Sequence, residues 1–261
     1  MLRVAGLVMA LLGLLLAPDQ ARAAGWAPAQ DDSFDVQFTT PFNLMRRAKI
    51  LELDLFDTSV EQIRQLKAKG VRTVCYINAG AWENWRPDSR DYPAKVIGRN
   101  YAGWPGERWL DIREHEALAP ILDKRLELCR SKGFDGVDLD NVDGYANRTG
   151  FPLTAKDQLD FNRWLAKEAR DRELAVGLKN SLELVPELVK DFDFAVSESC
   201  FSEDACGALE PFLKAQKAAF VIEYTNVRRK MDAHCKDAAE LGLQVIFKTK
   251  SLNGKLHRRC P

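Results

Sequence analysis

The stretch Gly133-Phe-Asp-Gly-Val-Asp-Leu-Asp-Asn-Val-Asp-Gly-Tyr145 carries four carboxylates in a segment that otherwise resembles a buried strand. Asp138 and Asp140 alternate with apolar residues, so both side chains lie on one face of the expected strand. Two like charges on one strand face are costly unless that face opens onto water, a metal or a substrate. The spacing therefore predicts a catalytic strand end.

The four carboxylates are not expected to be equivalent. Asp135 precedes the strand and Asp143 precedes a glycine, and both positions are typical of residues that bind turn amides. Asp138 has a structural alternative, as a carboxylate that pairs with a positive neighbour. Calcium is disfavoured because no glutamate follows at the EF-hand distance, so we expect no metal here.

The segments that position these carboxylates are short, near-continuous apolar runs, typical of strands covered on both faces. Eight strands are expected at residues 34–38, 50–55, 72–78, 136–141, 175–180, 192–198, 218–224 and 243–248. Helices are expected at residues 115–131, 154–172, 209–217 and 231–242. A capping box from Thr58 to Glu61 begins a further helix, which Gly70 ends.

This alternation predicts an α/β fold, a single-domain (β/α)8 TIM barrel rather than a doubly wound open sheet. No G-x-G-x-x-G motif follows a strand, which disfavours a dinucleotide fold, and we expect no cofactor. In such a barrel the chemistry occurs at the carboxyl ends of the strands.

Polar residues end five consecutive expected strands: Tyr76 to Asn78, Asp138 to Asn141, Lys179-Asn180, Ser197-Glu198 and Glu223-Tyr224. Glycoside hydrolysis fits these ends, because it needs one carboxyl group to donate a proton and another to attack or to activate water. Lys179 and Asn180 are candidate donors to Asp140. Glu223 has a structural alternative, as a partner of Lys248 or Lys179.

The longest connection, residues 79–114, is rich in tryptophan and tyrosine. Connections of this length are usually functional or disordered. The aromatic content favours an ordered loop that faces a ligand, because aromatic rings stack on the apolar C–H faces of sugars.

The overall composition excludes several classes of partner. The chain has 261 residues with 38 basic and 38 acidic side chains, so no basic excess is available to track phosphates, and we expect no nucleic-acid partner. Residues 4–17 are apolar, follow Arg3 and precede Ala21-Arg22-Ala23, a small-residue cleavage site. We therefore expect a signal peptide at residues 1–23, a secreted or periplasmic protein without stable membrane insertion, and a monomer.

The six cysteines fit an oxidising compartment, where disulfides persist. Six cysteines allow 15 pairings. We favour Cys200 with Cys206, which lie close in the sequence, and consider Cys235 with Cys260 a weaker pair. Cys75 lies in an apolar strand, and a buried free thiol is at least as well supported there as a disulfide.

An ordered set of motifs resembles one known family. The motifs run from Asp54-Leu-Phe-Asp-Thr-Ser59 and Cys75-Tyr-Ile-Asn-Ala-Gly80, through Glu83, Trp85-Arg-Pro-Asp88 and Trp109-Leu-Asp-Ile-Arg113, to Gly133–Tyr145, Gly150-Phe-Pro-Leu-Thr154, Gly177-Leu-Lys-Asn180, Glu198-Ser-Cys-Phe201 and Glu223-Tyr224. Together they resemble the domain of glycoside hydrolase family 114, the endo-α-1,4-polygalactosaminidase-like proteins. The first strand departs from the family pattern, with Gln37 as its clear match.

The resemblance implies a secreted (β/α)8 glycoside hydrolase domain over residues 24–261 that cuts within α-1,4-linked galactosamine polymers. It identifies Asp140 and Glu198 as the catalytic carboxylates without fixing their roles, and we favour a retaining mechanism. The residues implied to line the sugar subsites are Tyr76, Glu83, Arg86, Asp88, Asp138, Lys179, Asn180, Glu223 and Tyr224. Two alternatives stay open: a barrel that binds amino sugars without turnover, and a hydrolase of a different amino-sugar glycan.

Overall fold

A curled sheet of nine strands forms the centre of the computed structural model, which describes residues 25–45, 47–225 and 227–260. Successive strands along the chain lie side by side and run parallel: β1 (Phe34–Gln37), β2 (Ile50–Asp54), β3 (Arg72–Asn78), β7 (Gly136–Asp140), β8 (Ala175–Lys179), β9 (Phe194–Glu198), β10 (Ala218–Glu223) and β11 (Gln244–Phe247). The short strand β12 (Arg258–Arg259) adds to β11 in the antiparallel direction. The predicted strands are all present, within two residues at each end.

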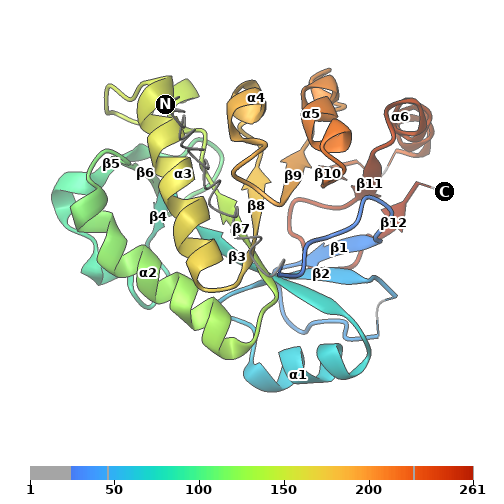
Figure 1. The fold of residues 1–261 in the computed structure, drawn as a ribbon, viewed down its shortest axis with the longest axis horizontal. Helices are drawn as coiled ribbons and strands as arrows, with labels where there is room; N and C mark the ends of the chain where they lie inside the picture. Colours follow the sequence, from blue (N-terminus) through green and yellow to red (C-terminus); the bar gives the residue numbers. More distant parts are fainter. Residues whose placement is uncertain (1–24, 46, 226, 261) are drawn as a thin grey trace, which may run out of the picture.

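Helices cover the outer face of the curled sheet (Figure 1). They are α1 (Val60–Ala68), α2 (His115–Lys132), α3 (Ala155–Asp171), α4 (Val185–Leu188), α5 (Glu210–Lys214) and α6 (Arg228–Leu241). The capping box of α1 is formed by Ser59 and Gln62, one residue later than predicted. In the ranges that the structure describes, no helix combines the length and apolarity of a membrane span. The predicted signal peptide at residues 1–23 lies outside the described residues.

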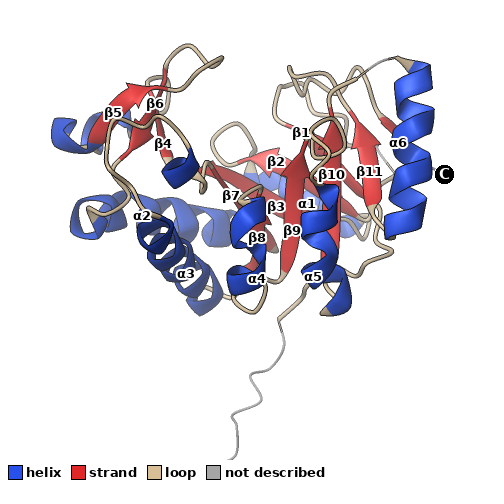
Figure 2. Cartoon of the chain, turned by 90° about the horizontal axis from the view of Figure 1, so that it is seen from above, coloured by secondary structure: helices blue, strands red, loops and turns tan. Residues whose placement is uncertain are grey.

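The long connection between β3 and α2 is ordered. It folds into a separate antiparallel sheet of β4 (Ala81–Glu83), β5 (Ile97–Asn100) and β6 (Glu107–Leu110), with β6 in the middle. Figure 2 shows this small sheet apart from the main sheet, near α2. The prediction of an ordered connection is therefore confirmed, although its strands were not anticipated.

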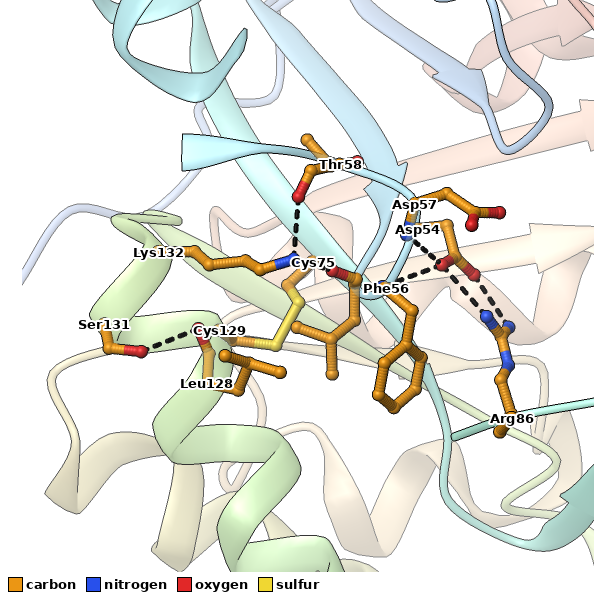
Figure 3. Close-up of a disulfide and its surroundings, with 11 residues drawn as sticks. Asp54, Phe56, Asp57, Thr58, Cys75, Arg86, Leu128, Cys129, Ser131 and Lys132 are labelled. Atoms are coloured by element: carbon orange, nitrogen blue, oxygen red, sulfur yellow. Dashed lines mark hydrogen bonds and ion pairs between the residues drawn. A yellow bond between two sulfur atoms is a disulfide. The ribbon is translucent and has the colours of Figure 1, made fainter. Parts of the chain in front are cut away.

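The cysteines of the described residues form three disulfides. The pairs Cys200–Cys206 and Cys235–Cys260 agree with the predictions. Cys75 and Cys129 also pair, which corrects the alternative of a free buried thiol at Cys75 and ties β3 to α2 (Figure 3). Neither side of this bond is accessible to solvent.

The inward face of the sheet changes character along its strands. At the amino ends, Phe34, Phe194 and Phe220 belong to an apolar cluster, in which the rings of Phe34 and Phe220 stack with centroids 4.6 Å apart. Gly177 leaves room for Phe194, whose ring would be 2.5 Å from any Cβ at that position. Every second residue of a strand lies on the same face of the sheet. On the inner face, these residues change from apolar at the amino ends to charged at the carboxyl ends.

The first and last of the parallel strands, β1 and β11, form no hydrogen-bonded ladder with each other within the described residues. The sheet is therefore curled but open. A buried ion pair between Asp35 on β1 and Lys248 after β11 connects the two sides. The imidazole Nδ1 of His257 lies 3.0 Å from the same carboxylate. Nearby, the Phe38 amide donates to the Leu252 carbonyl at 3.0 Å. The predicted eight parallel strands are therefore confirmed, but not barrel closure.

We expect Asp35→Asn to destabilise the protein by about 3–5 kcal/mol at neutral pH, because it leaves the buried Lys248 ammonium without its counter-charge. Burial raises the pKa of Asp35, but the His257 hydrogen bond and the Lys248 charge outweigh it and lower that pKa to about 2. Asp35 therefore stabilises the fold above its unfolded pKa, and about 2 kcal/mol of this is lost as the pH falls from about 4 to about 2.

Chemical unfolding at a series of pH values measures both effects. Asp31→Asn is the matched control, since Asp31 is an exposed aspartate close in the sequence. An Asp35→Asn protein that keeps the wild-type loss of stability between these pH values would contradict the assignment.

Candidate active site

Three charged side chains lie at the carboxyl ends of three neighbouring strands, on the inner face of the sheet. Asp140 ends β7, Lys179 ends β8 and Glu198 ends β9. Parallel pairing in the order β7-β8-β9 brings these ends to the same edge of the sheet. The structure therefore places together the two predicted catalytic carboxylates and one predicted donor.

The Lys179 ammonium is the centre of the site. Its Nζ lies 3.3 Å from Asp138 Oδ2, 3.4 Å from Asp140 Oδ1 and 3.5 Å from Glu198 Oε1. Burial alone would lower the pKa of Lys179, but the surrounding carboxylates, chiefly Asp140, Glu198 and Asp138, raise it well above its ordinary value. Lys179 is therefore a permanent cation between the carboxylates.

Asp140 and Glu198 each also accept a hydrogen bond from a tyrosine. Tyr76 donates to Asp140 Oδ2 at 2.8 Å, and Tyr224 donates to Glu198 Oε1 at 2.8 Å. Burial, followed by the negative charge of the accepting carboxylate, raises the pKa of both phenols. Both tyrosines are therefore neutral donors throughout the working range of pH.

The backbone is strained immediately after each of these three strand ends. Asn141, Asn180 and Ser199 have φ values of 61°, 47° and 62°, in the left-handed region that residues other than glycine rarely adopt. Such conformations persist only where the surroundings impose them, and they cluster at functional sites. The strain turns the chain sharply away, so that the preceding side chain remains at the rim of the sheet.

Close contacts fix the two carboxylate-bearing strand ends. The amides of Ala79 and Gly80 both donate to the Asp140 carbonyl, at 3.0 and 3.1 Å. A side chain at Gly80 is excluded, because its Cβ would lie 1.7 Å from the Asn141 carbonyl oxygen. On β9, the Glu198 amide donates to the Asn180 side-chain oxygen at 2.8 Å.

The site opens into a cavity of about 360 Å³. Six of the predicted subsite residues line it: Tyr76, Glu83, Arg86, Lys179, Asn180 and Tyr224. Trp85 and Trp104, from the small-sheet region, also line it and are 52% and 46% exposed, so their rings are available to stack on a ligand. Asp140 and Glu198 lie on its wall, with side chains 18% and 27% exposed.

The other three predicted subsite residues do not line the cavity. Asp138 is buried beneath Lys179. Asp88 pairs with Arg125 at 2.7 Å, on the side of α2. Glu223 accepts hydrogen bonds from the Phe201 amide at 2.8 Å and the Ser202 hydroxyl at 2.7 Å, so it supports the loop that follows Glu198.

A buried network attaches the small-sheet region to the main sheet. Arg86 pairs with Asp54 and with Glu83, each at 2.7 Å (the Asp54 contact is drawn in Figure 3). Arg125 from α2 reaches Asp88 and donates to the Asn78 carbonyl at 2.8 Å. These pairs hold one wall of the cavity against the ends of β2 and β3.

Sequence reasoning missed four acidic residues of the site. Asp54, Asp57 and Glu107 line the cavity, and Glu52 lies buried beneath it on β2. Burial and the negative charges of Glu83 and Asp140 raise the pKa of Glu107 to about 8. The hydrogen bond from the Asn78 side chain lowers this pKa, but by less. Strand alternation from Asp54 could have identified Glu52, since the two share one strand face. No comparable signal marked Glu107.

Asp143 lies in the predicted turn after β7, and Asp135 before it. Burial and the Asp140 charge raise the pKa of Asp143 to about 6. Asp143 lines a second hollow that shares Asn180, Glu198 and Tyr224 with the catalytic cavity. Asp135 accepts from the Thr73 amide on the neighbouring strand at 2.9 Å, rather than from amides of its own turn.

This arrangement supplies what hydrolysis of a glycosidic bond requires: two partly exposed carboxyl groups that share one cation, with a tyrosine donor to each. One carboxyl oxygen of each group lies within 3.5 Å of the same ammonium, so those oxygens are no more than twice that distance apart.

Comparison with known proteins agrees with this geometry. The model of glycoside-hydrolase family GH114 matches residues 16–260. The structure of Aspergillus fumigatus Ega3 in complex with galactosamine is 32% identical, with a TM-score of 0.87 over 91% of this chain and 98% of that chain. No curated protein matches the sequence.

The glycoside hydrolase domain of PelA from Pseudomonas aeruginosa shares the fold, with a TM-score of 0.68 and 17% identity over 86% of this chain and 97% of that chain. The family match spans most of the sequence, and the Ega3 structure covers 91% of the chain at 32% identity. The chain is therefore a glycoside hydrolase that belongs to family GH114.

Proposed function

We propose that the protein is an endo-acting hydrolase of α-1,4-linked galactosamine-containing polysaccharide. The observation that carries the proposal is the pair Asp140 and Glu198, joined through Lys179 at the wall of an aromatic-rimmed cavity. The galactosamine bound in the related Ega3 structure supports an amino sugar as the substrate unit. A single (β/α)8 domain over residues 24–261, in which side-chain contacts such as Asp35–Lys248 join the β1 and β11 sides, a monomeric state and export after signal cleavage belong to the same proposal.

In the proposed mechanism, Asp140 attacks the anomeric carbon while Glu198 protonates the leaving oxygen. The bond from the anomeric carbon to the leaving oxygen breaks as the bond to Asp140 forms. Water, deprotonated by Glu198, then displaces Asp140 and restores both carboxyl groups. Glu198 is the more exposed of the two, which suits the residue that exchanges its proton with the leaving group and with water.

The charge of the cavity supports a cationic substrate. Its lining contains the acidic residues Asp54, Asp57, Glu83, Asp140 and Glu198 against Arg86, Lys179 and Lys250, and Glu107 is not counted because its raised pKa leaves it largely neutral at neutral pH. Arg86 is already neutralised by Asp54 and Glu83, and Lys179 is shared by the carboxylates beneath and beside it. A sugar that carries a free ammonium group would therefore be attracted to this surface.

The shape of the site supports cleavage within a chain. The second hollow continues from Glu198 past Asn180 toward Asp143 and Tyr145, so the catalytic pair lies between two open regions. Sugar units on both sides of the scissile bond would then be accommodated, as an endo-acting enzyme requires.

We expect Asp140→Asn to reduce hydrolysis of a partially deacetylated galactosamine polymer by at least about a thousandfold, because the amide cannot form the glycosyl ester. Glu198→Gln should be equally impaired on the polymer but retain more activity on a galactosaminide with a good leaving group, which needs no protonation. Asp204→Asn is the control, because Asp204 is an exposed carboxylate in the loop after β9 and does not line the cavity.

Reducing-end assays of the purified variants give these rates. Activity at the wild-type level in both the Asp140→Asn and the Glu198→Gln protein would contradict the assignment. Tight binding of the polymer with no cleavage by the wild type would instead indicate a binding barrel.

Retention predicts that the sugar released first has the α configuration, because two displacements at the anomeric carbon restore the original geometry. Proton NMR during the first minutes of hydrolysis, before mutarotation, reads the anomer directly. Initial formation of the β anomer would show inversion, with water rather than Asp140 as the nucleophile.

Full N-acetylation of the polymer should lower kcat/KM by about tenfold or more, since it removes the cationic groups that the cavity attracts. Asp57→Asn should weaken binding of the deacetylated polymer and leave the acetylated polymer unaffected, because Asp57 is an exposed carboxylate of the cavity wall. Initial rates on the two polymers, at low and high salt, measure the difference. Equal rates on both would contradict a charge-based preference.

A further inference from the structure

The buried side of the catalytic site contains more carboxylates than its cation can balance. Glu52, Asp138, Asp140 and Glu198 all interact with Lys179, the single ammonium among them. Glu52 and Asp138 are completely buried, whereas Asp140 and Glu198 reach solvent. An ionised buried carboxylate without its own counter-charge is very costly. The excess negative charge must therefore be removed on the buried side.

Hydrogen bonding leads to the same conclusion independently of charge. Within the described residues, neither oxygen of Glu52 has a donor, and Oδ1 of Asp138 has none either. The two carboxyl groups interact directly with each other. Ionised carboxylates are acceptors only, so two of them side by side satisfy neither. One proton between the groups supplies the missing donor to both.

The proton belongs on Glu52 rather than on Asp138. Asp138 Oδ2 lies 3.3 Å from the Lys179 ammonium, which favours an ionised Asp138. Glu52 forms no such ion pair among the described residues and acts on Lys179 more weakly than the other three carboxylates. Burial and the charge of Asp138 raise the pKa of Glu52 well above its ordinary value. Glu52 pairs with Val74, which pairs with Gly136 on β7, so Asp138 lies two residues further along β7 on the same face of the sheet.

Building on the proposed function, we propose that Glu52 is a protonated carboxylic acid that donates its hydrogen bond to Asp138 and thereby positions Lys179 between Asp140 and Glu198. Asp138 without this donor would turn toward Lys179 and draw the ammonium away from the two reacting carboxylates. Glu52 is thus a positioning residue that acts through Asp138 and Lys179, out of contact with the sugar.

Substitutions at position 52 separate a donor from a mere space filler. Glu52→Gln keeps the shape and an N–H donor, so its kcat should stay within about threefold of the wild type. Glu52→Leu keeps the volume without a donor, and its kcat should fall about tenfold or more with little change in KM. Val74→Ala is the control: Val74 pairs with Glu52 in the sheet, is equally buried and bears no polar group.

If Glu52 only fills space, Val74→Ala and Glu52→Leu will lose activity to the same extent, and Glu52→Gln will be no more active than Glu52→Leu. Either result would overturn the proposal.

Infrared spectroscopy tests the proton without relying on activity. At neutral pH the wild type should show the carbonyl band of a protonated carboxylic acid that shifts when glutamate is 13C-labelled at its carboxyl carbon. Glu107, whose pKa is raised to about 8, and Glu198, the proposed proton donor, can add bands of their own. The Glu52 band should therefore persist in the Glu107→Gln/Glu198→Gln protein and disappear when Glu52→Gln is added to it.

The labelled band in the Glu107→Gln/Glu198→Gln protein also remains decisive if the position-52 variants fail to fold. Its absence would show that Glu52 is ionised and would overturn the proposal. A wild type that carries the band but hydrolyses no amino-sugar polymer would contradict the proposed function and leave the Glu52 assignment standing.

Discussion

The site depends on one buried ammonium group that is shared by several carboxylates. Lys179 is almost inaccessible to solvent, and its contacts with Asp138, Asp140 and Glu198 are nearly equal in length. A buried cation of this kind is stable only where carboxylates surround it, and the carboxylates tolerate each other only because the cation lies among them. The position of Lys179 therefore sets the spacing of Asp140 and Glu198, the two groups to which we assign the hydrolysis.

The fold supplies this arrangement by simple means. Parallel strands place every carboxyl end on one edge, and the change from phenylalanine at the floor to charge at the rim follows from the period of two along each strand. Left-handed residues after Asp140, Lys179 and Glu198 turn the chain away where the charged side chains must stay. The loop beyond Glu198 is held by the Cys200–Cys206 disulfide and by hydrogen bonds to Glu223, so rigidity extends outward from the rim.

Sequence alone predicted the strands, the meeting of Asp140 and Glu198 at one rim and Lys179 as a neighbour of Asp140, because these follow from local apolar runs and from strand ends meeting at one edge. Asp88 and Glu223 stand at similar strand ends and loops, yet their side chains turn to Arg125 and to the Ser202 hydroxyl, which pattern cannot reveal. Glu107 comes from a small sheet formed within a connection, and the ion pair of Asp35 with Lys248 joins distant parts of the chain. Contacts of this kind depend on the folded arrangement rather than on local spacing.

The most direct test of the central claim is a crystal structure of the Glu198→Gln protein with a galactosamine oligosaccharide bound across the cavity. The account predicts that the anomeric carbon of one sugar lies beside the Asp140 carboxylate, that its glycosidic oxygen contacts the side chain at position 198, and that Lys179 remains between the two. An oligosaccharide bound elsewhere, or one whose glycosidic bond lies away from both side chains, would contradict it.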